Sequence, residues 1–537
     1  MLFTSWVFIA CFLPIAIGGY WLCCSAGRVP AILWLIVISL TFYGFWMPYL
    51  IVLIGCSIAF NYSVSVAIRR NSSRPQLQII LLWFGIGCDL AALIYYKYAY
   101  SLLAYLAQFD LFSSAAIDTI VLPLGISFFT FTQIGYLVDC KDGVTKDDNI
   151  LDYVLFVTFF PHLIAGPILH NGEIMPQFAN PANFGLRAVN LAPGLTLFVI
   201  GMLKKSLFAD TLSAEVASGF GGATSIQFVS AWLAALAYSI QLYFDFSGYT
   251  DMAIGLALLF NIRFPPNFNS PYRAHNIIDF WQRWHMSLTR FLTQYLYNPI
   301  ALTLRRRRAA RGAPMSRQAL QSPAAFASLV AFPTIVTMAL AGIWHGAGIT
   351  FLIFGLLHGV YLTVNHGWRM YGPKQNIETR SRTAQLMVWL AGATATYLAV
   401  LVGQIFFRSS TLDQAWHMLT AMVGFHGVAS NVTASVLLEQ TGLAKRLLAA
   451  SGLLYFFTTD QLKLLAQLCV SFAVVWLMPN SQQIMVAAQP ILGRIAEPVP
   501  SFMRWQANFP WAIVVGLAML IATLSLGGTS EFLYFQF

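Results

Sequence analysis

The sequence has few charged residues, and this shortage argues against a soluble protein. Asp, Glu, Lys and Arg make up only 9% of the 537 residues, whereas 58% are hydrophobic and the mean hydropathy is +0.69. Soluble domains carry about 25% charged residues, because a surface in contact with water needs them. Most of the surface of this chain is therefore expected to face lipid, and we predict an integral membrane protein.

Cysteine is also scarce, and several common site signatures are missing. The seven cysteines are scattered and form no C-x-x-C pair, so the sequence supports neither a disulfide framework nor a zinc site. The chain contains no H-E-x-x-H, no Walker A and no G-x-S-x-G motif. We therefore expect no bound metal.

Long apolar stretches occupy most of the chain. A spanning helix needs about 20 apolar residues, and candidate spans lie near 3–22, 31–45, 48–67, 79–107, 117–138, 151–169, 190–208, 228–260, 326–343, 349–366, 385–406, 462–478 and 511–527. We predict an all-α polytopic fold with roughly 11–13 transmembrane or re-entrant helices. Residues 1–537 are expected to form one membrane domain, with polar or interfacial segments near 261–325 and 407–461. The first stretch lacks a basic n-region, so we interpret it as a retained span.

The net charge of +10 comes mainly from arginines and lysines in loops between spans. Examples are Arg69 and Arg70, the pair Lys204 and Lys205, and the arginine run at 305–308. The positive-inside rule places such loops in the cytoplasm. A nucleic-acid partner is not expected.

The polar stretch after residue 260 is the most informative one. Pro265, Pro266 and Pro271 prevent a continuous helix at its start. Large apolar residues then recur at spacings of three and four, which predicts one amphipathic helix over residues 276–297. Such a helix lies at the membrane interface or plugs a cavity.

Two of the nine histidines lie in matching G-x-x-H-G frames within apolar runs. They are His345 and His358, and the flanking glycines allow neighbouring backbones to approach closely. An ionisable residue in a membrane segment indicates function, although either histidine could simply form a hydrogen bond between helices. On one unbroken helix the two rings would be about 20 Å apart and about 220° apart around the axis. They can meet only if the chain breaks, and residues 346–348 are the obvious place.

Two carboxylates within an apolar run keep a second class of function open, although such residues are few. Asp245 and Asp251 lie within an apolar run, as the carboxylates of proton-coupled transporters do. A membrane transporter or flippase is therefore the alternative to an enzyme.

The ordered motifs resemble a known family. They include Phe159-Phe-Pro-His-Leu-Ile-Ala-Gly-Pro167, Gln241-Leu-Tyr-Phe-Asp-Phe-Ser-Gly-Tyr-Thr-Asp251, Asp279-Phe-Trp-Gln-Arg-Trp-His-Met-Ser-Leu288 and Gly342-Ile-Trp-His-Gly346. The chain resembles the membrane-bound O-acyltransferase (MBOAT) family, specifically its alginate O-acetylase-like branch. This resemblance implies a multi-helix fold with a funnel from the cytoplasm to a catalytic histidine at His345. The family's second histidine falls on His358 or on His285.

The resemblance also implies substrates and partners. It implies transfer of acetyl groups from cytoplasmic acetyl-CoA toward hydroxyls of an exported, alginate-like polysaccharide, at a bacterial inner membrane. A separate periplasmic SGNH-type esterase-like partner is expected, and D-alanyl transfer to teichoic acid is an alternative within the same fold. After Tyr297 the chain continues as Asn298-Pro-Ile and departs from the alginate type, so the acceptor stays open.

Two further groups of residues are predicted to serve the transfer. Arg283, Arg290 and Trp284 lie beside His285, and arginine binds phosphates bidentately, so we expect them near the donor entrance. Tyr534 is the only hydroxyl in the last six residues. A mobile tail could carry the acyl group on it as a relay, whereas aromatic residues at an interface ordinarily anchor a helix end.

Overall fold

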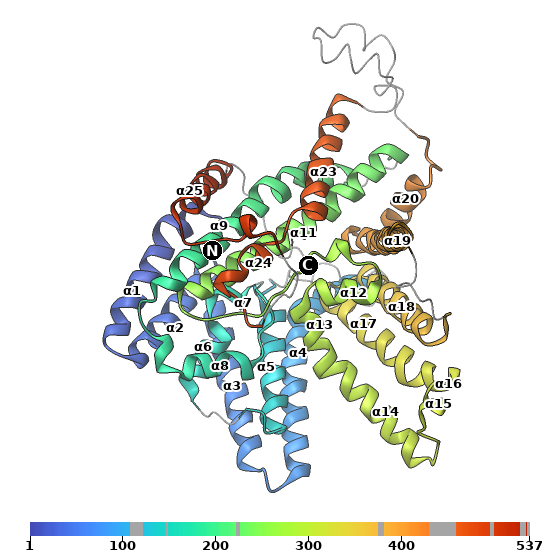
Figure 1. The fold of residues 1–537 in the computed structure, drawn as a ribbon. Helices are drawn as coiled ribbons and strands as arrows, with labels where there is room; N and C mark the ends of the chain where they lie inside the picture. The colour runs from blue at the N-terminus through green and yellow to red at the C-terminus, as the bar shows by residue number, and fades with distance from the viewer. Residues whose placement is uncertain are drawn as a thin grey trace.

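The protein, described here by a computed structural model, is an assembly of packed helices (Figure 1). The structure describes residues 1–107, 122–145, 149–164, 166–221, 226–373, 381–428, 458–493, 499–526 and residue 533. Within these residues the β-type pairing is one isolated bridge between Phe264 and Ile491. The predicted all-α membrane fold is confirmed.

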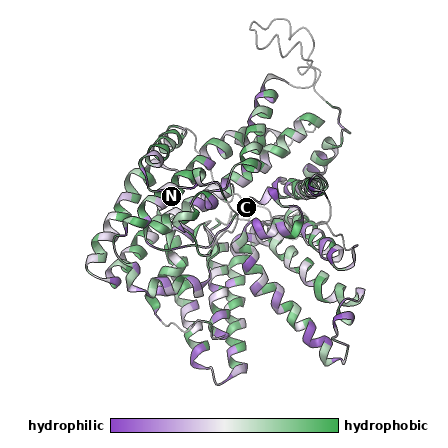
Figure 2. Cartoon of the chain, in the orientation of Figure 1, coloured by the Kyte–Doolittle hydropathy of each residue, from purple (hydrophilic) through white to green (hydrophobic). Residues whose placement is uncertain are grey.

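Eight helical segments of the described chain are long and apolar enough to cross a membrane (Figure 2). Five of them lie in one helix each: Leu50–Arg70 (α3), Pro75–Leu103 (within α4, Pro75–Ala107), Ile349–Tyr371 (α18), Arg382–Arg408 (α19) and Asp460–Leu477 (within α23, Thr459–Leu477). The other three join several helical elements. Phe8–Ser25 runs from η1 (Phe8–Phe12) into α1 (Leu13–Ser25), Ala188–Gly219 runs from α9 (Ala188–Leu203) to α10 (Ser213–Gly219), and Pro323–His345 runs from α16 (Pro323–Phe326) to α17 (Phe332–His345). Two shorter apolar helices are α2 (Arg28–Gly44) and α25 (Phe509–Leu524). The chain is therefore a multi-pass membrane protein.

The 32-residue helix α11 (Phe228–Leu259) runs through the middle of the molecule (Figure 1). At 1.5 Å per residue it is about 48 Å long. Every residue from Ala237 to Leu259 is buried, and α9 packs along it. This central helix supplies a wall of the site described below.

Shorter elements connect the long helices. They are α5 (Ile126–Lys141), α6 (Ile150–Thr158), α7 (Phe160–Leu163), α8 (Asn171–Ala179), η4 (Lys204–Ala209), α12 (Ile277–Arg283), α13 (Met286–Leu292), η7 (Thr293–Tyr297), α14 (Asn298–Ala310), α15 (Arg317–Leu320), α20 (Leu412–Met422) and α24 (Ser481–Ile484).

The span predicted over 151–169 does not form one helix. Its helical parts are α6 and the four-residue α7, separated at Phe159, whose ψ of 107° is not helical. Pro161 contributes to the break because a proline removes a backbone hydrogen-bond donor from the helix. The segment is nevertheless buried inside the protein, where irregular backbone is tolerated within a membrane.

The single amphipathic helix predicted over 276–297 is also wrong. The segment folds as α12 and α13, followed by the π-helical η7, with a break at Trp284 and His285. Trp284 is extended, and His285 has a left-handed backbone with a φ of 44°. The large apolar side chains face inward, so this segment fills the interior and does not lie flat on the membrane surface.

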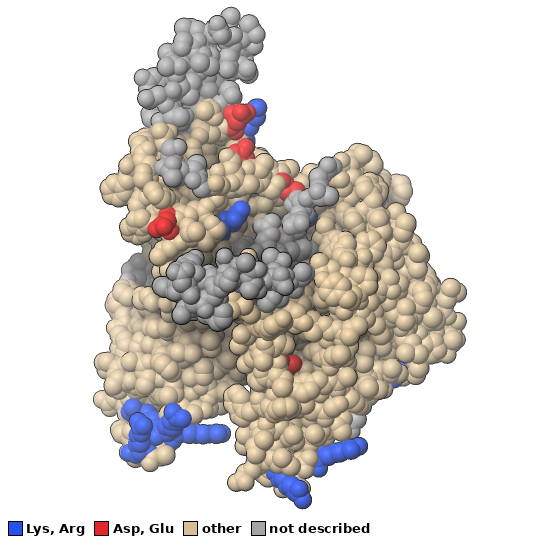
Figure 3. Space-filling view, turned by 180° about the vertical axis from the view of Figure 1, so that it is seen from behind, with Lys and Arg blue, Asp and Glu red and all other residues tan. Residues whose placement is uncertain are grey.

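Basic side chains gather at one end of the molecule (Figure 3). This is the end where the α3–α4 connection, with Arg69, Arg70 and Arg74, and the arginine run of α14 lie. Most of the acidic side chains visible in this view lie toward the opposite end. By the positive-inside rule, the basic end is expected to face the cytoplasm.

Candidate active site

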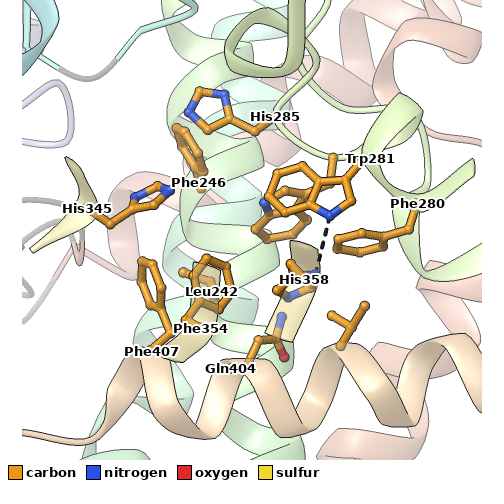
Figure 4. A pocket seen from close by; sticks show the side chains of 12 residues that line it. Leu242, Phe246, Phe280, Trp281, His285, His345, Phe354, His358, Gln404 and Phe407 are labelled. Atoms are coloured by element: carbon orange, nitrogen blue, oxygen red, sulfur yellow. Dashed lines mark hydrogen bonds between the residues drawn. The ribbon is translucent and has the colours of Figure 1, made fainter. Parts of the chain in front are cut away.

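Three histidines that are far apart in the sequence line one small, buried cavity (Figure 4). His285 comes from the α12–α13 junction, His345 ends α17, and His358 lies in α18. The cavity volume is about 30 Å³. The other residues of its wall are Leu242, Phe246, Phe280, Trp281, Trp284, Phe354, Val400, Gln404 and Phe407. An almost wholly apolar wall around three imidazoles and one amide shields polar chemistry from water and lipid.

The chain breaks between the two G-x-x-H-G frames, a point that the sequence left open. Helix α17 ends at His345, and α18 begins at Ile349 after extended residues at Gly346 and Gly348. The two helices therefore fold back on each other, which brings His345 and His358 to the same cavity.

Glycines set the distance between α17 and α18. A Cβ atom on Gly342 would lie 2.3 Å from the carbonyl oxygen of Phe351, and one on Gly355 would lie 2.3 Å from that of Met338. Both distances are far below van der Waals contact, and the obstructing atoms belong to the backbone. Only glycine permits this approach, as expected for close helix contacts in membranes.

Two residues of α4 hold the end of α17. The ammonium of Lys97 donates to the carbonyl oxygens of Trp344 at 2.6 Å and of His345 at 3.0 Å. The hydroxyl of Tyr98 donates to the carbonyl of Ile343 at 2.6 Å. These carbonyls have no partner inside the helix, and a cation at a helix C-terminus is favourable. Lys97 and Tyr98 thereby fix the backbone that carries His345.

Aromatic rings enclose His345. Its ring centroid lies 4.8 Å from that of Trp344 and 5.1 Å from that of Phe407, and the residue is only 7% exposed. The imidazole is therefore largely shielded from solvent and forms part of the cavity wall.

The proton of His358 is assigned by its neighbour. The indole N–H of Trp281 donates to Nδ1 of His358 at 3.3 Å (Figure 4). Nδ1 is then the acceptor, so in the neutral ring the proton lies on Nε2. Among the described residues Nε2 of His358 has no hydrogen-bond partner.

His285 adopts an unusual backbone conformation. With φ 44° and ψ 52° it is left-handed, which costs a non-glycine residue about 1–3 kcal/mol and is often found at functional sites. Burial lowers the pKa of its imidazole to about 3, so the ring is neutral near pH 7. Its Nδ1 lies 3.1 Å from Oδ1 of Asn267, a residue that the sequence did not single out.

Trp281 separates the cavity from two clefts that adjoin each other. Their volumes are about 640 Å³ and 250 Å³. Both are lined by Trp281, Gln282, Thr289 and Thr293, and the larger one also by Arg290. Trp281 is thus a wall that the cavity and both clefts share.

The residues predicted at the donor entrance have different surroundings. Arg290 lines the larger cleft and forms a bidentate ion pair with Glu173, at 2.6 and 2.8 Å. Arg283 pairs with Asp279 at 2.8 Å and lines neither cleft. Trp284 forms part of the cavity wall. Tyr534 lies outside the described residues.

The carboxylates that suggested a transporter are paired with lysines. Asp245 lies 2.6 Å from Nζ of Lys205, and Asp251 lies 2.5 Å from Nζ of Lys204. Such pairs are the usual way to stabilise charges inside a membrane protein. They join η4 to α11, the central helix that supplies Leu242 and Phe246 to the cavity wall.

Of the residues at the site that we did not predict, one could have been found from the sequence. Lys97 is the only basic residue of α4, and a lone cation in an apolar span indicates a role. Asn267 and Gln404 gave no such signal, because their positions depend on how distant segments pack.

The chain is similar to several known proteins. The family model described as "MBOAT, membrane-bound O-acyltransferase family" matches residues 31–313. The chain is 38% identical over 460 residues to the peptidoglycan O-acetyltransferase of Helicobacter pylori, covering 80% of this chain and 81% of that protein. It is 37% identical over 430 residues to the probable alginate O-acetylase AlgI of Azotobacter vinelandii, covering 79% and 78%. Identity to the teichoic acid D-alanyltransferase of Bacillus subtilis is 28% over 252 residues, covering 47% and 60%.

Proposed function

Because this chain belongs to the membrane-bound O-acyltransferase family, we propose that it moves acetyl groups from acetyl-CoA toward hydroxyls of an exported polysaccharide. The chain is an O-acyltransferase, so the transporter alternative is set aside. The observation that carries the proposal is the convergence of His285, His345 and His358 on one buried cavity.

The size of the cavity supports a small acyl group. A space of about 30 Å³ is about two to three times the roughly 10–15 Å³ that one water molecule requires. An acetyl group fits such a space better than a long acyl chain does. The clefts beside Trp281 would hold the extended arm that carries the acetyl thioester.

The proposed reaction is acyl transfer from sulfur to oxygen. An acceptor hydroxyl loses its proton and attacks the thioester carbonyl carbon, the carbon–sulfur bond breaks, and the sulfur leaves as a thiol after taking up a proton. A neutral imidazole can take the hydroxyl proton, or attack the carbonyl itself. His345 is our first candidate for this role.

The acceptor is proposed to be a carbohydrate polymer outside the cytoplasm. Two relatives are named for acetylation of peptidoglycan or of alginate, and the chain covers 81% and 78% of their lengths. We propose an alginate-like exopolysaccharide as the acceptor, a bacterial inner-membrane location, and a periplasmic SGNH-type partner that completes the transfer. D-alanyl transfer is the alternative, since a D-alanyltransferase also resembles this chain.

The test is transfer by the purified protein. Wild-type protein in detergent or vesicles, supplied with acetyl-CoA and a soluble glycan, should release free CoA thiol and produce an acetylated glycan. Parallel reactions with peptidoglycan fragments, alginate oligomers and a D-alanyl thioester would identify the acceptor and the acyl group. Absence of acyl transfer from every donor would refute the proposal.

Arg290 is expected to contribute to donor binding more than Arg283 does. A hydrogen bond to a charged group contributes about 1.5–3 kcal/mol, so Arg290→Gln should raise the KM for acetyl-CoA about tenfold or more. Arg283→Gln is the matched variant, because this arginine lines neither cleft. Glu173→Gln shows whether loss of the ion pair alone accounts for the effect. Unchanged KM values in both arginine variants would argue against a role in donor binding.

Tyr534 is proposed to relay the acyl group across the membrane. A hydrocarbon core of about 30 Å prevents one fixed side chain from reaching both compartments. Leu533 supports the idea, because its backbone N–H donates to Asp245 at 3.0 Å, deep in the protein. Tyr534→Phe keeps the aromatic ring and removes the hydroxyl, so it should stop polymer acetylation at normal protein levels. Little change would instead identify the tail as a membrane anchor.

A further inference from the structure

One oxygen atom holds the segment that carries His285. Oδ1 of Asn267 accepts from the backbone N–H of Ser287 at 3.2 Å and from the Ser287 hydroxyl at 2.8 Å, and it lies 3.1 Å from Nδ1 of His285. The backbone carbonyl of Asn267 also accepts from the N–H of Met286 at 2.9 Å. Asn267, His285 and Ser287 are each at most 1% exposed, so water does not compete for these groups.

These contacts determine which atom of the Asn267 amide faces His285. A backbone N–H can only donate, so the atom opposite Ser287 must be the oxygen and not the amide nitrogen. The Ser287 hydroxyl accepts from the N–H of Ile168 at 2.9 Å, and its own proton is therefore available for Asn267. The amide nitrogen of Asn267 faces the hydroxyl of Thr250 at 3.3 Å.

The orientation of the amide assigns the His285 tautomer. Because Oδ1 of Asn267 only accepts, Nδ1 of His285 must carry the proton. In a neutral imidazole Nε2 is then the unprotonated nitrogen. Nε2 has no hydrogen-bond partner among the described residues, and His285 lines the cavity. This tautomer is opposite to that of His358, whose Nδ1 accepts from Trp281.

We infer that Asn267 is a positioning residue that presents Nε2 of His285 to the cavity as a proton acceptor. The inference rests on the proposed acyl transfer and adds a role within it. In this assignment His345 is the nucleophile: its imidazole attacks the thioester carbonyl carbon, the carbon–sulfur bond breaks, and the sulfur leaves as a thiolate. The hydroxyl of the acceptor then gives its proton to Nε2 of His285 as its oxygen attacks the acetyl carbon and the bond to His345 breaks. Nε2 passes that proton to the thiolate. Asn267 contacts neither substrate and acts by holding Nδ1–H throughout.

The test is a double-mutant cycle in the acetyl-transfer assay. His285→Ala should reduce transfer about 10²- to 10⁴-fold, as expected when a base is lost. Asn267→Leu should reduce transfer about 10- to 100-fold, the loss found when comparable partners of metal-bound histidines are removed. A residue that acts only through His285 gives no further loss in the double variant. Independent losses that multiply would overturn the inference.

Two further variants separate positioning from a general loss of structure. Asn267→Asp keeps an oxygen acceptor for Nδ1–H and for Ser287, so it should retain transfer within about tenfold of wild type. Thr250→Val removes only the contact to the amide nitrogen and should leave transfer unchanged. Melting temperatures of the purified variants show which of them remain folded.

The outcomes distinguish this inference from the proposed function. If wild-type protein does not transfer acetyl groups, the proposed function fails. If wild-type protein is active and His285→Ala is equally active, or Asn267→Asp is as poor as Asn267→Leu in folded protein, the positioning role fails while the proposed function stands.

Discussion

Replacing His345 by alanine is expected to reduce acetyl transfer by at least about 10²- to 10⁴-fold, because it removes an imidazole that attacks the carbonyl carbon or takes the hydroxyl proton. The imidazole lies between Trp344 and Phe407 at the end of α17, and it lines the cavity. Apart from the three histidines and Gln404, the residues that line this cavity are apolar or aromatic, so a histidine is the best candidate to take a proton there. The measurement is release of CoA thiol and acetylation of the glycan by purified protein.

His417→Ala is the control for the loss of a histidine. His417 is exposed on α20 and lines none of the cavities described above. Its replacement should change neither the melting temperature nor the rate. Transfer near the wild-type rate in folded His345→Ala protein would exclude His345 as base and as nucleophile.

Gly355→Ala is expected to destabilise the protein and to suppress transfer as well. Its new Cβ atom would lie 2.3 Å from the carbonyl of Met338 and 3.0 Å from Cα of Gly342, so α17 and α18 must move apart. Overpacking of this kind typically costs about 1–3 kcal/mol. Separating the two helices would also displace His345 from His358.

Gly516 provides a control for this prediction. Gly516 lies in α25, and a Cβ atom there would meet nothing within 4 Å. In an open helical position alanine is favoured over glycine by about 1 kcal/mol, so Gly516→Ala should keep or raise the melting temperature. The two substitutions should therefore differ in sign. Equal melting temperatures and equal transfer in both variants would contradict the role assigned to Gly355.

Local sequence patterns could predict those features of the site that depend on neighbouring residues in the chain. Two glycines marked residues 346–348 as the place where the chain could break, and the structure shows that the helix does break there. The same reasoning failed over residues 276–297. Apolar side chains at spacings of three and four continue on both sides of His285, so periodicity cannot reveal that one residue between them is left-handed. The prediction of one span over residues 151–169 was also wrong. Hydrophobicity shows that a segment is buried, but it does not show whether its helix is continuous.

The sequence by itself determined that this protein is a bundle of membrane helices, and it singled out the histidine in each G-x-x-H-G frame as a candidate for function. Both conclusions depend on composition and on residues within a few turns of each other. Only the tertiary structure decided which distant groups meet. Lys97 reaches the end of α17 across 248 positions, and Trp281 meets His358 across 77. Asn267 meets His285 across 18 positions that include α12, and it turns its oxygen toward the ring. Such contacts arise from packing of whole helices, which places side chains that share no local pattern in one buried space.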